Sequence, residues 1–193
     1  MTEKQFNYLF SKAEELMKKS NDPVHDWSHA EQVVNKALKI NNLLVKELDE
    51  RIIKIAAAWH DISYAFYRKG IIQYFLEGRR SSKISRKYFK KIKLPQNETN
   101  LISDIILHHP FADLSFLGKG FLNKKRSLYH QIIQDADTLS ESPERFEKGV
   151  NKESLFYKLF FRYIVVKFFK VRNKKIEKFL NLKESLTFAQ RNV

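Results

Sequence analysis

The residues of this chain best suited to chemistry are four side chains that can ligate a metal ion, and they lie far apart in the sequence. His29 is close to the N-terminus, His60 and Asp61 are adjacent, and Asp137 comes much later. A divalent cation that activates water needs several fixed nitrogen or oxygen ligands and open positions for water and substrate. Two imidazoles and two carboxylates suit Mn, Fe, Ni, Co or Zn, and suit Mg less well. The chain has no cysteine, so a thiolate site is excluded.

The His60-Asp61 pair stands at the end of the most apolar helical segment of the chain. Residues 52–59 read Ile-Ile-Lys-Ile-Ala-Ala-Ala-Trp, a run that is apolar nearly all round. Such a run is typical of a central, buried helix. A charged pair is costly to bury at its end unless something compensates the charge. A bound cation would do so.

The remaining histidines are weaker candidates. His25 precedes the first candidate ligand by four residues, so the two share one helix face, and we expect His25 to be a helix cap or a partner of the ligands. Asp104 and His108 have the same spacing, and we expect them near the site, where they would orient water or act as a general acid. His109 is expected to lie less close than His108, and His130 to be structural or exposed.

The elements that must position these groups are expected to be helices. Apolar residues recur at spacings of three and four, whereas alternation with a period of two is rare. Gly and Pro number only 5 and 4, which favours long elements. A short stretch between Gly70 and Gly78 has no clear assignment, and residues 111–126 are expected to form a loop. The predicted helices cover residues 3–19, 25–44, 49–65, 81–91, 98–109, 128–139, 151–171 and 174–189.

The chain is strongly basic and carries no obvious targeting signal. Its formal net charge is +14, and residues 151–193 contribute +8 of it, from 11 Lys or Arg and 3 acidic residues. The N-terminal stretch is charged where a signal peptide would be apolar. Residues 155–171 are apolar but interrupted by four Lys or Arg, which argues against a membrane span. We expect a cytoplasmic protein with no transmembrane segment, whose basic surface is either a solvated face or a polyanion-binding one.

Three motifs resemble the HD superfamily of metal-dependent phosphohydrolases. They are HDWSHAEQVVNKAL at residues 25–38, AAWHDISY at 57–64 and IIQDADTL at 132–139, in the order that the family shows. The resemblance covers roughly residues 20–145. It implies an all-α HD-domain helical bundle at residues 1–145, followed by a basic C-terminal helical extension at 146–193 packed on it. Carried over by position, the implied metal ligands are His29, His60, Asp61 and Asp137, and Asp135 is the weaker candidate for the last ligand.

The chain also departs from the pattern of this superfamily. Many relatives carry further His between the HD pair and the last Asp, but no His lies between Asp61 and Ile106 here. Where relatives commonly have Glu or His before a Ser-rich helix, we find residues 78–80, Gly-Arg-Arg. The Asp-Arg-Leu of some relatives is Asp-Thr-Leu at residues 137–139. These departures favour a single metal ion and leave the substrate open.

The resemblance implies hydrolysis of a phosphate ester or a nucleotide by a metal-bound water. Because phosphoryl transfer develops negative charge, cationic side chains at the mouth are expected to stabilise it. The candidates are Arg79, Arg80 and Lys83, which follow the HD helix, and Asp61, His108 and Asp104 are the candidate catalytic groups. The expected partner is a small phosphorylated molecule, a nucleotide first; a homodimer is also compatible with the sequence.

Two alternatives to an enzyme remain open. A degenerate HD domain could bind a nucleotide or another polyanion as a sensor or interaction module, as the lack of a middle His suggests. A polyanion-binding protein could use the basic C-terminal helices, although nucleic acid is not the favoured partner. Metal-dependent turnover separates the first alternative from an enzyme, and salt-dependent polyanion binding that is lost with residues 151–193 would support the second.

Overall fold

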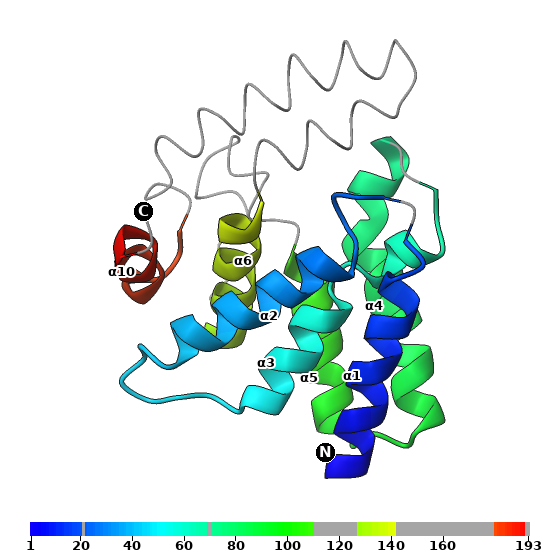
Figure 1. The fold of residues 1–193 in the computed structure, drawn as a ribbon. Coiled ribbons are helices and arrows are strands. Elements are labelled where there is room, and N and C mark those ends of the chain that lie inside the picture. Colours follow the sequence, from blue (N-terminus) through cyan, green and yellow to red (C-terminus); the bar gives the residue numbers. More distant parts are fainter. Residues whose placement is uncertain (21, 69–70, 110–126, 142–179, 192–193) are drawn as a thin grey trace, which may run out of the picture.

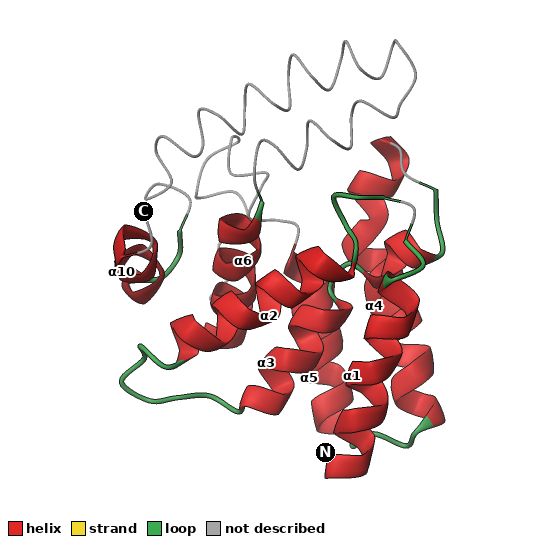
Figure 2. Ribbon diagram, in the orientation of Figure 1, coloured by secondary structure: helices red, strands yellow, loops and turns green. Residues whose placement is uncertain are grey.

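The computed structural model describes residues 1–20, 22–68, 71–109, 127–141 and 180–191, and the regular elements of this part are all helices (Figure 1). No strand occurs among the described residues (Figure 2), as the sequence predicts. None of their helices is both long and apolar enough to cross a bilayer. The helices are α1 (Glu3–Met17), α2 (Trp27–Asn41), α3 (Glu50–Trp59), the 3₁₀ helix η1 (Ile62–Ala65), α4 (Ile71–Lys91), α5 (Gln96–His108), α6 (Leu128–Ser140) and α10 (Lys183–Arg191).

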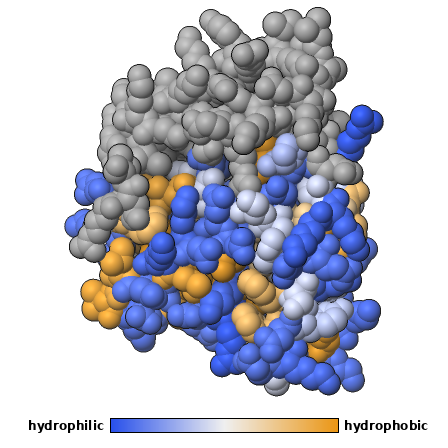
Figure 3. All heavy atoms as spheres, in the orientation of Figure 1, coloured by the Kyte–Doolittle hydropathy of each residue, from blue (hydrophilic) through white to orange (hydrophobic). Residues whose placement is uncertain are grey.

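Helix α3 forms the centre of the core, as its apolar sequence predicts. It packs against α1, α2, α5 and α6, while α4 packs against α5 and η1. Trp59 at its end is fully buried, and its indole N–H donates a hydrogen bond to the carbonyl of Leu9 in α1 at 3.0 Å. The same ring contacts Tyr88 and Phe89 of α4. Charged and polar side chains cover much of the described outer surface (Figure 3).

Helix α3 ends earlier than the sequence predicts, and this correction shapes the site. The predicted helix ran on to Ala65, but α3 stops at Trp59 with His60 as its C-cap. Asp61 then leaves helical geometry at φ −104° and ψ 15°, and η1 follows. The apolar pattern continues across this break because η1 is also buried, so periodicity alone could not place the end of the helix. The break lets His60 and Asp61 point into one space.

Helix α4 is longer than predicted and has a well-defined end. It begins at Ile71, so the unassigned stretch before Gly78 belongs to it. At its C-terminus Leu94 N–H donates to Phe89 C=O at 3.0 Å and Lys93 N–H donates to Lys90 C=O at 3.1 Å. These two bonds define a Schellman motif, with Lys93 in the left-handed region at φ 53°.

The end of the chain is attached to α6 through one buried carboxylate. Asp135 Oδ1 accepts hydrogen bonds from the backbone N–H and the side-chain amide of Asn181, at 2.8 and 2.7 Å, and Oδ2 accepts from Leu182 N–H at 2.9 Å. Burial raises the pKa of Asp135, and these bonds partly offset that effect. Helix α10 begins directly afterwards. The predicted helix at 151–171 and the predicted domain boundary at 145/146 lie outside the described residues.

We expect the substitution Lys93→Gly to stabilise the fold by about 0.5–1 kcal/mol. A left-handed conformation costs an L-residue roughly 1–2 kcal/mol, and glycine avoids this cost while losing some chain entropy on folding. Urea unfolding of the full-length chain measures the change. Lys87→Gly, in the exposed interior of α4, is the matched control and should destabilise by about 1 kcal/mol. A loss of stability in Lys93→Gly would contradict the assigned helix end.

Candidate metal centre

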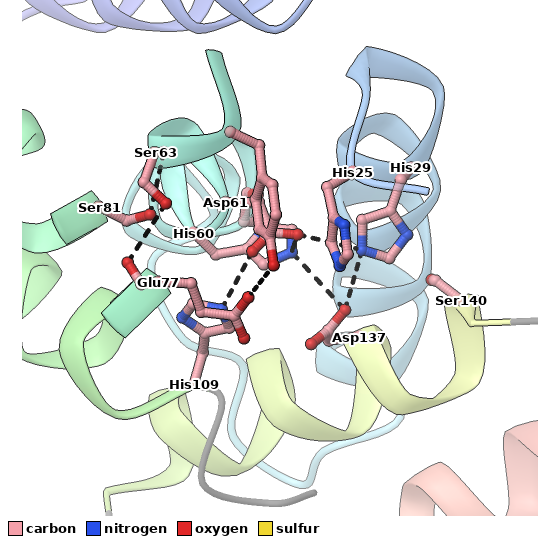
Figure 4. A network of polar contacts seen from close by, with 12 residues as sticks. His25, His29, His60, Asp61, Ser63, Glu77, Ser81, His109, Asp137 and Ser140 are labelled. Atoms are coloured by element: carbon pink, nitrogen blue, oxygen red, sulfur yellow. Dashed lines mark hydrogen bonds and ion pairs between the residues drawn. The ribbon is translucent and has the colours of Figure 1, made fainter. Parts of the chain in front are cut away.

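The four predicted ligands converge in the structure (Figure 4). His29 Nε2 lies 3.0 Å from Asp137 Oδ1 and 3.6 Å from Asp61 Oδ2. His60 Nε2 lies 3.1 Å from Asp61 Oδ2 and 3.6 Å from Asp137 Oδ1. Each imidazole nitrogen therefore contacts both carboxylates, and the side chains are almost completely buried except that of Asp137, which is 14% exposed. Asp137 is therefore the one member of the cluster that solvent reaches to a small extent.

Helix ends bring these residues together. Asp26 caps α2 and its carboxylate accepts the backbone N–H of His29 at 3.0 Å, which fixes His29 in the first turn of that helix. His60 and Asp61 stand at the break after α3. Asp137 lies in the last turn of α6, which packs against α2. Three elements far apart in sequence thus position one cluster.

The hydrogen bonding of His60 indicates that the cluster needs a positive charge. Its Nδ1 lies 2.6 Å from the carbonyl of Ala57, and a carbonyl only accepts, so Nδ1 carries the proton. In the neutral ring Nε2 then presents a lone pair to Asp61 and Asp137. This atom is buried and has no hydrogen-bond partner. Lone pairs that face one another in a buried place are costly, and either a proton on Nε2 or a metal ion removes the cost.

The distances within the cluster fit a small divalent ion. Ligands about 2.1 Å from a common ion lie roughly 3.0–3.4 Å from one another in octahedral or tetrahedral geometry. Two of the four nitrogen–oxygen distances, 3.0 and 3.1 Å, fall in that interval, and the other two, both 3.6 Å, lie just above it. With two imidazoles and two carboxylates, the chemistry of the donor set also fits. His29, His60, Asp61 and Asp137 are therefore able to hold a divalent cation.

The protonation of the cluster follows from its electrostatics. Burial opposes a charge on His60, but the two carboxylates outweigh it and raise its pKa well above the ordinary value. Burial lowers the pKa of His29. Burial would raise the pKa of Asp61 and Asp137, but the neighbouring histidines hold both pKa values below the ordinary range. In the metal-free protein both carboxylates are charged and His60 carries the compensating proton.

Two further buried residues, which the sequence did not assign to the site, lie next to Asp61. They are His109 and Glu77. His109 is buried, and its Nε2 lies 3.3 Å from Asp61 Oδ1. Its Nδ1 donates to the carbonyl of Ile106 at 2.7 Å, so Nε2 again offers a lone pair. Glu77 of α4 is buried and forms a further potential metal-binding group with Asp61 and His109. The described residues therefore offer ligands for a second ion, although the sequence favoured one.

His25 is placed as the sequence expected, beside the ligands. Its Nδ1 lies 2.7 Å from Asp22 Oδ2, and its ring stacks on that of Tyr64 with centroids 4.0 Å apart. The hydroxyl of Tyr64 donates to Glu77, and burial, followed by the charges of Glu77 and Asp61, raises the pKa of this tyrosine well above its ordinary value. Tyr64 is therefore a hydrogen-bond donor that holds Glu77 in place.

Asp104 and His108 form a cluster of their own with His130. His108 Nδ1 lies 3.2 Å from Asp104 Oδ1, and His130 Nε2 lies 3.0 Å from Asp104 Oδ2. The Asp104 and His108 side chains are 52% and 38% exposed. The sequence expected His108 to lie nearer the site than His109, and the structure reverses that order. One helical residue is a rotation of about 100°, so two adjacent histidines face different neighbours.

The three predicted phosphate-binding residues lie on α4. One of them, Arg80, is linked by hydrogen bonds to Ser63, which follows the His60-Asp61 pair. Arg80 Nη1 donates to Gln73 Oε1 at 2.5 Å, and Gln73 Nε2 donates to the Ser63 hydroxyl at 2.6 Å. The guanidinium carbon of Arg80 also lies 4.2 Å from the ring centroid of Tyr67. Arg79 and Lys83 are exposed on the outer face of the helix.

The fold and the cluster define an all-helical domain with a candidate divalent-metal site. Residues 26–142, more than half of the chain, match the HD domain family. The chain belongs to that family, as its three sequence motifs indicate. No curated protein and no solved structure matches the chain.

Metal binding should release about one proton per ion near neutral pH. The proton comes from His60, whose raised pKa keeps it charged in the metal-free protein, whereas the two aspartates are already ionised. Affinity should therefore fall as the pH falls, because protons compete for the same nitrogen. Calorimetric titration of Mn²⁺ or Zn²⁺ in buffers of different ionisation enthalpy measures the release.

The control is Glu50→Gln, which removes an exposed carboxylate of α3 outside the cluster and should leave both proton release and affinity unchanged. His60→Gln should lose the proton release and weaken binding. Metal binding with the same enthalpy in every buffer would contradict the assigned protonation of the centre.

Proposed function

We propose that this protein is a metal-dependent phosphohydrolase acting on a phosphate ester or a nucleotide. A divalent cation in the centre would lower the pKa of a water molecule towards neutrality and polarise a phosphoryl oxygen. The observation that carries the proposal is the buried, unpartnered Nε2 of His60, which faces two ionised carboxylates. Membership of the HD family supports the reaction class.

The side chains around the centre have distinct parts in this proposal. His29, His60, Asp61 and Asp137 hold the cation. Nε2 of His109 lies 3.3 Å from Oδ1 of Asp61, and the two atoms would share a second cation, which would hold that carboxylate in place. Glu77, held by Tyr64, adds a carboxylate that is able to accept a proton from water.

Arg80 is the best placed of the three candidate phosphate ligands. Its guanidinium contacts Gln73 and the ring of Tyr67, and Gln73 in turn donates a hydrogen bond to Ser63, two residues after Asp61. A guanidinium binds phosphate oxygens with two parallel hydrogen bonds and stays charged at any relevant pH. Arg79 and Lys83 would contribute at longer range.

The direct test is release of phosphate or pyrophosphate from a panel of nucleotides with Mn²⁺, Co²⁺, Ni²⁺, Zn²⁺ or Mg²⁺. We expect His60→Ala and Asp137→Ala each to lower kcat/KM by more than about 100-fold, since loss of a ligand exceeds the 10–100-fold effect of losing a ligand's partner. Glu50→Ala, which removes an exposed carboxylate of α3, is the control and should keep full activity.

Full activity in His60→Ala or Asp137→Ala would remove the metal centre from the mechanism. Tight nucleotide binding without turnover under every metal would instead identify a non-enzymatic HD domain that acts as a sensor or interaction module.

Two adjacent histidines at the C-terminal end of α5, His108 and His109, are alternative candidates for an imidazole that assists the metal centre. We expect His109→Ala to lower kcat/KM by about 10–100-fold, because Asp61 loses a buried partner. His108→Ala should change kcat/KM by less than about twofold, because its side chain is partly exposed and pairs with Asp104. The opposite ranking would restore His108 as the general acid that the sequence suggested.

A further inference from the structure

The exposed face of α4 carries a run of positive charge that extends well beyond the three candidate phosphate ligands. Between Glu77 and Glu98 the sequence has no acidic residue and eight Lys or Arg. All but Arg80 of these eight are exposed. At 100° per residue, five of them fall within an arc of about 100°. We call these five the α4 stripe: Arg79, Lys83, Arg86, Lys87 and Lys90.

Several lysines on other helices are paired with nearby carboxylates. On α1, Lys12 pairs with Glu15 at 2.5 Å, Lys18 with Glu14 at 2.6 Å and Lys19 with Glu15 at 2.9 Å. No member of the α4 stripe forms an ion pair with a described residue. The stripe is therefore a set of like charges held side by side on one helix. Their mutual repulsion raises the free energy of the unbound protein, and a polyanionic partner would relieve it.

The spacing of the stripe suits the backbone of a nucleic acid. From Arg79 to Lys90 the helix rises by about 17 Å. Duplex DNA presents one negative charge per roughly 1.7 Å of its axis, so about ten phosphates lie along that length. Five cations in one band along one side of the helix match a uniformly charged, elongated partner better than a compact one.

The apolar content of this face argues against a membrane as the partner. Helices that lie on a bilayer insert large apolar side chains beside their cationic ones. The exposed large apolar residues of the described chain are Tyr8, Leu43, Val45, Phe66, Tyr67 and Leu128, and none of them lies on α4. We therefore infer that the α4 stripe is a docking surface for the phosphodiester backbone of a nucleic acid, independent of base sequence.

The test is fluorescence anisotropy of the full-length chain with a short labelled duplex of DNA or RNA. If five phosphates are neutralised, log K should fall with log salt at a slope of about −4.5, which is roughly a 500-fold loss between about 50 and 200 mM. The triple variant R86Q/K87Q/K90Q removes three contacts. Its slope should be about −1.8, and its affinity should fall only about tenfold over that range.

The matched control removes the same charge from another helix. K12Q/K18Q/K19Q lowers the net charge by the same three units on α1, and it should keep the slope and the affinity of the wild type. The charge-preserving variant R86K/K87R/K90R should also bind as the wild type does, and unchanged circular dichroism of all three variants verifies their folding. None of these substitutions touches a residue assigned to the metal centre or to substrate phosphate.

Equal binding and equal slopes for R86Q/K87Q/K90Q and the wild type would overturn the inference, as would equal losses in the two charge-removing variants. Binding to vesicles rich in anionic lipid without binding to either duplex would overturn it in favour of a membrane. Preference for RNA or for DNA identifies the type of nucleic acid, and binding to either one supports the inference.

Discussion

The structure depends on one buried electrostatic conflict, in which the lone pair of a histidine nitrogen faces two carboxylates. The carbonyl of Ala57 forces the proton of His60 onto Nδ1, and the opposite nitrogen then faces the carboxylates of Asp61 and Asp137. A positive charge must sit among these groups. In the metal-free protein it is a proton on His60, and a divalent cation held by these groups would take its place. The break after α3 and the cap of α2 bring these groups together.

The same constraint explains how the surrounding residues are arranged. Asp61 has one oxygen towards His29 and His60 and the other towards His109, so that a single carboxylate joins two sets of potential ligands. Tyr64 contacts residues on both sides of Asp61, because its ring stacks on His25 and its hydroxyl donates a hydrogen bond to Glu77. The chemistry is concentrated where the ends of α3, α5 and α6 meet the first turn of α2.

Helical periodicity predicted the all-helical fold, and the resemblance of three motifs to the HD superfamily implied that four candidate ligands converge. It missed the break at Asp61, since the buried η1 continues the apolar pattern of α3. It also missed Glu77, which precedes Gly78 in a stretch whose helix could not be assigned. His108 and His109 were ranked in the wrong order, because a helix end known only to within one or two residues leaves the direction of each side chain open. The first two errors concern helix bounds, and the third concerns the direction of side chains.

The most direct measurement is the anomalous difference density of a crystal loaded with Mn²⁺ or Zn²⁺, recorded at the absorption edge of that metal. A peak bounded by His29 Nε2, His60 Nε2, Asp61 and Asp137 is the expected result. Density confined to other residues, or its absence from this cluster in a fully loaded crystal, would contradict the metal centre and the function inferred from it.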